Sequence, residues 1–190
     1  MALVHAKTKL WTREEYYRLA ESGILAPDAR VELIEGEIVP MPPQGPDHSH
    51  SVATLTTKFV RLFGETHFVR VQLPLDLGAS QPEPDFSLVV LEGESRSSLP
   101  TRADLVVEVA KSSLSFDRNE KASVYAKAGL PELWILNLEA SQVEVFRRPV
   151  PSSESSYGFG YASREILVGE DTLSPLFSPA TRFTAEELLS

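Results

Sequence analysis

Three short apolar segments and one helical segment in the middle of the chain most constrain the fold. Residues 85–91, 104–110 and 133–136 are apolar runs of strand length, and residues 117–128 carry apolar positions at helical spacing. A strand, a helix and a second strand within about 30 residues form a βαβ unit, whose two strands lie parallel in one sheet. Residues 143–146 alternate like a strand and are expected to add an antiparallel partner. The pattern predicts an α/β (α+β) fold with a central mixed β-sheet flanked by helices.

The rest of the chain is expected to surround this unit with shorter elements. A helix should begin after Thr12, because Thr12 and Glu15 form a capping-box pattern and Gly23 supplies a C-terminal stop. Glu35 and Gly36 separate two short alternating runs and therefore predict a hairpin turn. The other predicted elements are an amphipathic helix at 48–63, strands at 68–73 and near Ile166, a short helix from Thr184, and exposed loops at 40–47 and 149–160.

Length and composition are typical of one soluble domain. The chain has 190 residues, of which 42% are hydrophobic and 24% charged. No apolar run approaches the roughly 20 residues that span a bilayer, and the first residues lack the apolar core of a secretory signal. We therefore expect a cytoplasmic protein without a membrane partner. It should fold as a single domain over residues 1–190, with residues 1–10 as a loosely ordered N-terminal segment.

The cysteine count and the charge balance exclude several kinds of site. Without cysteine the chain has no disulfide, thiolate zinc site, iron–sulfur cluster or cysteine nucleophile. Its 18 basic and 27 acidic residues give a net charge of −9, which argues against bulk electrostatic coating of nucleic acid. A local basic groove, or an acidic site that first takes up a metal cation, remains compatible with this balance. Neither a phosphate-binding glycine loop nor a GxSxG nucleophile turn is present.

Three charged residues interrupt the apolar surfaces of the predicted unit. Glu108 lies inside an apolar strand, Lys121 shares the apolar face of the helix with Tyr125, and Asp85 opens a strand after Pro84. Each has a plain structural interpretation: a glutamate paired at the wet end of a strand, a lysine that snorkels to water, and an acid in a turn. Together they suggest a site, because two acids on adjacent strands can share a hard divalent cation beside a lysine that polarises phosphate.

The segments around these residues resemble a known family. The strings QPEPDFSLVV and LVVEVAKSSLSFDRNEKASVYAKAGLPELWILNLEASQVEVFRRP, with VELIEGEIVPMPPQGPDH before them, are similar to the Uma-two family of bacterial restriction endonuclease-like proteins. The similarity runs from about Trp11 to the C-terminus. It implies the restriction-endonuclease-like PD-(D/E)XK nuclease fold, Mg²⁺ (or Mn²⁺) as cofactor and DNA as substrate.

The resemblance also implies roles for named residues. Asp85 matches the motif aspartate and Glu108 the motif (D/E), so both are expected to be catalytic and to bind the metal. The usual motif spacing places the lysine at position 110, which is Ala110 here. Lys121 on the following helix matches the family's lysine and is expected to be the third catalytic residue. Lys111 lies one position late and should face away from Glu108.

Several further residues are weaker candidates for the same site. Glu83 lies two positions before the motif aspartate and can face the same cation. Gln72 matches the family's strand before the proline–aspartate step, and His48 stands where the family often has histidine, although a simple helix-start role is the plainer interpretation. Tyr125 is expected to pack beside the motif lysine. Among the glutamates of the predicted hairpin, Glu37 is favoured to complete an acidic cluster, and the alternative is a solvated face.

Substrate capture and assembly lead to two more expectations. Positive charge for a DNA backbone should come from a rim of basic residues, namely Lys58, Arg61, Arg70, Lys111, Arg118, Arg147 and Arg148. A homodimer is expected by analogy with related nucleases, with residues 143–146 and the strand near Tyr161 as the candidate pairing edge.

The leading hypothesis is a metal-dependent endonuclease that hydrolyses DNA phosphodiester bonds. The alternative is a catalytically silent nuclease-fold module that binds or regulates, which the acidic net charge favours. A third interpretation is an interaction protein whose acidic face mimics nucleic acid. The target sequence, its strandedness and the biological role are left open by the sequence.

Overall fold

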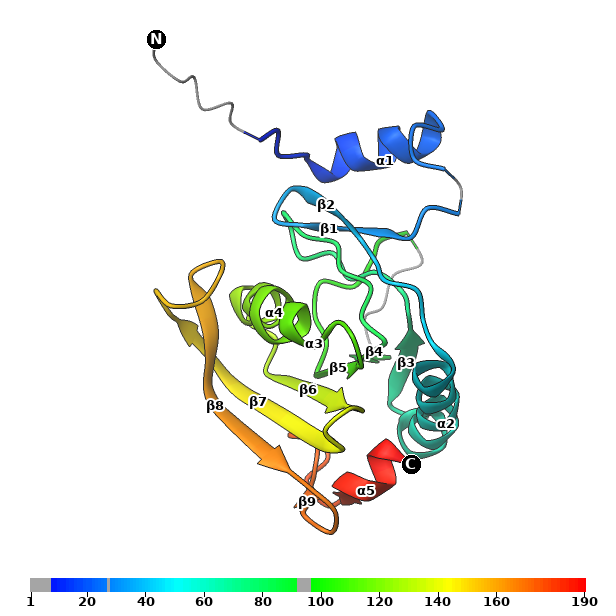
Figure 1. Ribbon diagram of the computed structural model, residues 1–190, viewed down its shortest axis with the longest axis vertical. Helices are drawn as coiled ribbons and strands as arrows, with labels where there is room; N and C mark the ends of the chain where they lie inside the picture. The colour runs from blue at the N-terminus through cyan, green and yellow to red at the C-terminus, as the bar shows by residue number, and fades with distance from the viewer. Residues whose placement is uncertain (1–7, 27, 92–96) are drawn as a thin grey trace.

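A six-stranded mixed β-sheet forms the centre of the molecule (Figure 1). The computed structural model describes residues 8–26, 28–91 and 97–190. The strands of the central sheet are β3 (His67–Val71), β4 (Phe86–Val90), β5 (Leu105–Ala110), β6 (Glu132–Asn137), β7 (Gln142–Pro151) and β8 (Phe159–Leu167). They follow one another across the sheet in this order; β5 and β6 are parallel, and the other neighbouring pairs are antiparallel. This architecture confirms the predicted α/β class, including the parallel βαβ pair.

Helices cover both faces of the sheet because each presents one apolar stripe. The covering helices are α2 (Pro46–Phe63) and α5 (Ala185–Leu189) on one face, and α3 (Leu114–Phe116), the π-helical turn η1 (Asp117–Lys121) and α4 (Ala122–Lys127) on the other. Leu55, Phe59 and Phe63 of α2 recur every four residues and enter the larger apolar core with α5. Ala122 and Tyr125 enter the second core, against the opposite face of β5 and β6.

A short hairpin lies over the helical layer that contains α4 (Figure 1). Its strands are β1 (Val31–Ile34) and β2 (Glu37–Pro40). Glu35 and Gly36 form the turn, as predicted, with φ angles of 48° and 84° that suit a tight hairpin. A bridge between Leu33 and Gln81 ties the hairpin to the segment that leads into β4. The hairpin is therefore held close to the start of β4.

The remaining elements lie at the two ends of the chain. They are α1 (Arg13–Glu21), β9 (Thr172–Leu173) and β10 (Phe183–Thr184). The predicted capping box is present, since Thr12 and Glu15 bond each other's backbone N–H. A second capping box joins Thr184 and Glu187. Within the described residues, none of the helices combines the length and the hydrophobicity that crossing a membrane requires.

The exposed loop predicted at residues 149–160 is present but shorter than predicted. β7 continues to Pro151 and β8 begins at Phe159, so residues 152–158 form the loop and the two ends of the segment belong to the paired strands. The cause is that β6 pairs with β7 only as far as Arg147. From Pro149 onward one side of β7 pairs with no other strand of the described residues, and proline is tolerated there because no ladder hydrogen bond is lost.

Two predicted boundaries also differ in the structure. The helical segment predicted at 117–128 begins at Leu114. The loop predicted at 40–47 is shorter, because α2 begins at Pro46, which occupies the first helical turn without losing a hydrogen bond. Of the N-terminal segment predicted to be loosely ordered, residues 1–7 lie outside the described residues, and residues 8–10 are exposed without regular structure.

Candidate active site

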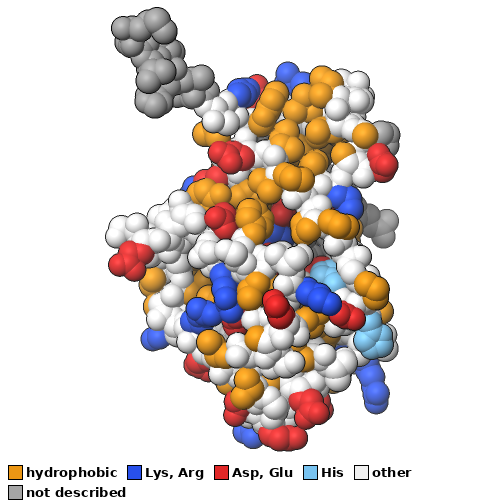
Figure 2. Space-filling model, viewed as in Figure 1, with side chains coloured by type: hydrophobic (Ala, Val, Ile, Leu, Met, Phe, Trp, Pro, Cys, Tyr) orange, Lys and Arg blue, Asp and Glu red, His pale blue; other side chains and the backbone are white. Residues whose placement is uncertain are grey.

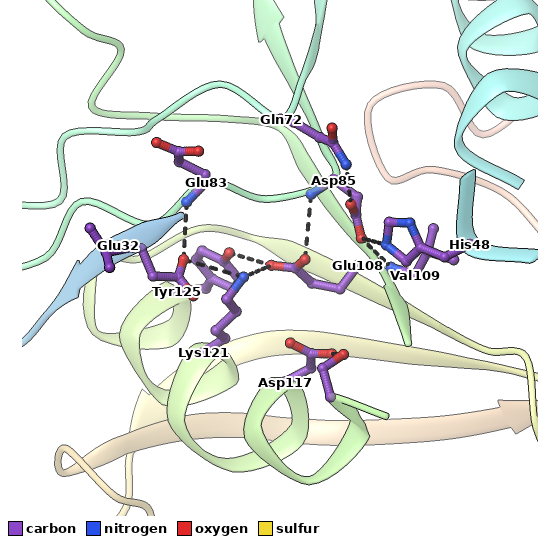
Figure 3. Close-up of polar contacts among 12 residues, drawn as sticks. Glu32, His48, Gln72, Glu83, Asp85, Glu108, Val109, Asp117, Lys121 and Tyr125 are labelled. Carbon is purple, nitrogen blue, oxygen red and sulfur yellow. Dashed lines mark hydrogen bonds and ion pairs between the residues drawn. The ribbon is translucent and has the colours of Figure 1, made fainter. Parts of the chain in front are cut away.

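Asp85 and Glu108 lie side by side because of the register between β4 and β5. These strands are antiparallel and pair Phe86 with Val107. Asp85 precedes Phe86 and Glu108 follows Val107, so the two acids lie next to each other at the end of this ladder. The Asp85 N–H points to Glu108 Oε2 at 3.4 Å. Both residues are buried, at 8% and 3% exposure. The register that buries the apolar neighbours therefore also places two carboxylates together (Figure 3).

Three donors hold the Asp85 carboxylate. Gln72 Nε2 donates to Oδ1 at 3.1 Å, the Val109 N–H donates to Oδ2 at 2.8 Å, and His48 Nε2 lies 3.0 Å from the same Oδ2. Burial alone would raise the pKa of Asp85, but the hydrogen bonds, led by the one from His48, outweigh it and lower that pKa. Asp85 is therefore held as a charged carboxylate at neutral pH.

Glu108 is held by two donors from the helix above it. Oε1 accepts the Tyr125 hydroxyl at 2.5 Å and lies 3.2 Å from Lys121 Nζ. Lys121 and Tyr125 are four residues apart, which places both on the inward face of the helical segment. The Lys121 side chain is 7% exposed and its ammonium contacts carboxylates rather than reaching water. The snorkelling interpretation of this lysine is therefore wrong.

Glu32 on the hairpin supplies the second carboxylate to Lys121. Its Oε2 lies 3.4 Å from Lys121 Nζ and accepts the Glu83 N–H at 3.2 Å. Glu37, which the sequence analysis favoured for this role, is exposed. Glu32 pairs with Val39, whereas Glu37 lies two residues closer to the turn. Both glutamates lie on one face of the hairpin, but Glu32 is buried against Lys121 and Glu37 is exposed.

Asp117 is a buried carboxylate that the sequence analysis missed. It is 3% exposed and accepts a hydrogen bond from Ser113 Oγ at 2.6 Å. It opens the π-helical turn η1, and π-helical turns occur frequently at functional sites. Its spacing of four residues from Lys121 is the signal that would have found it, because the two share the inward face.

Burial dominates the titration of this cluster. It raises the pKa of Glu108 to about 8, where the charges of Asp117 and Asp85 add to the rise while Lys121 opposes it. Burial also raises the pKa of Asp117 to about 6, against the opposing charge of Lys121. For Lys121 burial acts to lower the pKa, but the surrounding carboxylates, with Glu108 first, outweigh it and raise that pKa. The ammonium therefore stays charged, while Glu108 readily holds a proton.

Lys111 and the rest of the predicted basic rim do not join the cluster. Lys111 is exposed beyond the end of β5 and pairs with Asp47 of α2, at the edge of the site. Arg118 and Arg147 pair instead with buried glutamates of the sheet, Glu144 and Glu132. Six of the predicted rim residues lie outside the pocket that covers the cluster, namely Lys58, Arg61, Arg70, Arg118, Arg147 and Arg148.

A pocket of about 560 Å³ lies over the cluster. Its charged lining consists of Glu32, Glu83, Asp85, Glu108 and Asp117, with His48, Arg30, Lys111 and Lys121. Its apolar lining consists of Val39, Pro40, Met41, Pro42, Pro43, Val109 and Phe116. Figure 2 shows the face with the hollow between the hairpin and the α4 layer, where charged side chains are visible between hydrophobic ones. Five carboxylates thus meet three lysine or arginine side chains in one pocket.

The two central carboxylates fit a hard divalent cation. Among the described residues, Asp85 Oδ1 accepts one hydrogen bond and Glu108 Oε2 accepts one long one, so both oxygens keep lone pairs for a ligand. The described part of the chain contains no group of three or more His, Asp or Glu side chains arranged to hold a metal. Mg²⁺ usually takes one or two carboxylates and completes its shell with water and substrate phosphate oxygens. A site with two carboxylates suits that habit.

This sheet, its flanking helices and the paired carboxylates define a protein of the restriction-endonuclease-like PD-(D/E)XK fold. A solved structure, described as a putative nuclease belonging to DUF820 from Anabaena variabilis ATCC 29413, matches with a TM-score of 0.70 at 18% identity, over 94% of this chain and 97% of that chain. The family model of Uma2, described as putative restriction endonuclease, matches residues 13–186. The chain therefore belongs to the Uma2 family, which confirms the resemblance found in the sequence. No curated protein matches the chain significantly.

Proposed function

We propose that this protein is a metal-dependent endonuclease that hydrolyses phosphodiester bonds of DNA. The observation that carries the proposal is the buried set of Asp85, Glu108 and Lys121 lining one pocket. Phosphodiester hydrolysis requires an activated water and compensation for the negative charge that builds on the phosphate. Two carboxylates that suit a cation, with an ammonium beside them, supply both requirements. Membership of the Uma2 family supports this assignment.

Asp85 and Glu108 would hold Mg²⁺ or Mn²⁺. When bound, such a cation lowers the pKa of a water molecule and offsets charge on the phosphate. Asp85 is prepared for this role because His48, Gln72 and the Val109 N–H keep it ionised. Glu108 has to release its proton first, because a carboxylate ligates a cation in its ionised form.

Lys121 supplies a fixed positive charge to the substrate. Its ammonium is held between Glu32 and Glu108, so it needs little reorganisation when negative charge develops nearby. We assign it the role of orienting the attacking water or stabilising the transition state. Tyr125 and Glu32 are positioning residues, which fix Glu108 and Lys121. Glu83 lines the same pocket, and burial raises the pKa of its half-buried side chain.

Cleavage of a random-sequence DNA pool tests the proposal without knowledge of the target. Single- and double-stranded pools are incubated with Mg²⁺ or Mn²⁺, with EDTA as the metal-free control. The wild type should cleave, and Asp85→Asn and Glu108→Gln should not. Lys121→Met should lose about 10²–10³-fold in rate, as for removal of one transition-state donor. Glu37→Gln is the matched control, because its exposed carboxylate lies outside the pocket and its loss should leave the rate unchanged.

Full activity in Asp85→Asn and Glu108→Gln would contradict the assignment of the site. A wild type that binds the cation but cleaves neither pool would favour the catalytically silent module, which the net charge of −9 also favours. Homodimerisation, the cytoplasmic location and the single domain over residues 1–190 stay predictions. Light scattering on the purified protein tests the first of these.

A further inference from the structure

The pocket combines the acidic cluster with apolar side chains, and its volume suits a small ligand. Its volume of about 560 Å³ lies within the range of about 300–1,000 Å³ found for sites that enclose a small ligand. Phe116 is half-buried, lines the pocket and directly precedes the buried Asp117. Met41, Pro42 and Pro43 add further apolar surface to the same lining. The pocket is therefore lined by an aromatic ring whose residue directly precedes a carboxylate of the cluster.

The charges around the pocket do not suit the backbone of a duplex. Proteins that grip double-stranded DNA commonly neutralise about 6–10 phosphates. Here the lining holds Arg30, Lys111 and Lys121, and the last of these is engaged by Glu32 and Glu108. The six other predicted rim residues lie outside the pocket, as described above. Lys111 pairs with Asp47, but both side chains are exposed, so a phosphate can replace that carboxylate. Among the described residues, Arg30 and Lys111 are therefore the cations of the lining that can meet a phosphate beyond the cluster, which gives about two backbone contacts.

We infer that DNA enters this site as an unpaired strand, with a base stacked on Phe116 and its phosphate at the cation that Asp85 and Glu108 would hold. In a duplex both faces of a base are covered by its neighbours, whereas an unpaired base offers a free face to an aromatic side chain. Stacking of this kind tolerates any base and strengthens binding by about 5- to 150-fold per base. The inference rests on the proposed function for the position of the scissile phosphate.

Binding measurements with matched probes test the inference separately from cleavage. A fluorescently labelled oligonucleotide of mixed sequence is titrated as a single strand, as a duplex, and as an abasic single strand. The buffer contains Ca²⁺, and gels verify that the probes stay intact. The wild type should bind the single strand at least tenfold more tightly than the duplex. Its affinity for the single strand should fall with salt at a log–log slope of about −1.4, the value for two contacts, rather than about −5 or steeper for a duplex.

Phe116→Ala should weaken binding of the normal single strand by about 5- to 150-fold and leave the abasic strand unchanged. The unchanged abasic affinity shows that the variant is folded, and Phe116→Leu, which keeps apolar bulk without the ring, should show the same selective loss. Phe68→Ala is the matched control, because Phe68 is 46% exposed on β3 and lies outside the pocket. Its affinity for every probe should equal that of the wild type.

Three results would overturn the inference: equal or tighter duplex binding, a steep salt slope, or single-strand affinity that does not depend on Phe116. These results are distinguishable from failure of the proposed function. Phe116-dependent binding without cleavage by the wild type supports the stacking contact and counts against the nuclease activity. Cleavage of duplex without dependence on Phe116 supports the activity and rejects the inference.

Discussion

Replacing Glu108 by glutamine is expected to stabilise the metal-free protein at neutral and alkaline pH. Glutamine has nearly the same shape and keeps an oxygen that accepts from Tyr125 and Lys121, but it has no acidic proton. The wild-type carboxyl has a pKa of about 8 in the folded protein, chiefly because of burial, against an ordinary value of 4.5. Between these two values the folded protein keeps a proton that the unfolded chain has released. Wild-type stability therefore falls as the pH rises through this window.

The size of the effect follows from the width of that window. The pH of 7 lies about 2.5 units above the ordinary pKa of 4.5 that applies to the unfolded chain. Within the window, each pH unit lowers the stability of the wild type by about 1.4 kcal/mol. Glu108→Gln should thus gain about 3 kcal/mol at pH 7, nothing near pH 4.5, and on the order of 5 kcal/mol above pH 8. The gain at pH 7 corresponds to a rise in Tm of about 6–12 °C for a chain of this size.

Urea unfolding at several pH values between about 5 and 9, in EDTA, measures these differences. Glu37→Gln, which removes an exposed carboxylate outside the pocket, serves as the control and should match the wild type at each pH. If instead an ionised Glu108 forms a stabilising pair with Lys121, removing it leaves a buried charge and costs about 3–5 kcal/mol. A Glu108→Gln protein that is less stable than the wild type at pH 8 would therefore refute the reasoning.

Three further outcomes follow from the same contacts. Mn²⁺ binding should release close to one proton per ion at about pH 6.5, because Glu108 must ionise to bind the ion. Calorimetry in buffers of different ionisation enthalpy measures the number of protons released. A value of zero would contradict the raised pKa of Glu108. Ser113→Ala removes the donor to Asp117, so it should raise the pKa of Asp117 above about 6 and cost about 1 kcal/mol, and an unchanged titration of this carboxyl by NMR would reject the contact. Glu132→Gln weakens the buried pair with Arg147 and should cost about 3 kcal/mol in urea unfolding without changing Mn²⁺ affinity; weaker Mn²⁺ binding by a folded variant would contradict this separation.

The central residues of the site were predictable because their signals are local. Glu108 in an apolar strand and Lys121 on an apolar helix face stand out, since charged side chains are rarely placed inward without a partner. Strand and helix periodicity then fix the face on which each lies, and the order of the strands places Asp85 nearby. Fold class and the position of these three residues therefore follow from patterns a few residues long.

The supporting carboxylates were not predictable in the same way, because long-range contacts select them. Glu32 and Glu37 share one face of the hairpin, and the bridge between Leu33 and Gln81 decides which of them meets the cluster. Asp117 is the first residue of the helical segment predicted at 117–128, and an acid in the first turn of a helix is ordinary. In the structure the helical segment begins three residues earlier, at Leu114, and Asp117 lies in its buried interior.

Composition predicted the loop between β7 and β8 but not how far the two strands extend into that segment. Proline, serine and glycine are the ordinary residues of loops, and the segment from Pro149 to Gly160 is rich in all three. Whether a proline interrupts a strand depends on whether a neighbour needs its N–H, and that depends on where β6 ends. The end of a neighbouring strand is not written in the composition of the segment itself.

Calorimetric titration of Mn²⁺ into the metal-free protein tests the central claim most directly, because it does not depend on the target sequence. The wild type should bind the ion saturably, Asp85→Asn should lose this binding, and Lys121→Met and the Glu37→Gln control should keep it. Equal binding by Asp85→Asn, or no binding by the wild type at millimolar Mn²⁺, would contradict a cation site built on Asp85 and Glu108.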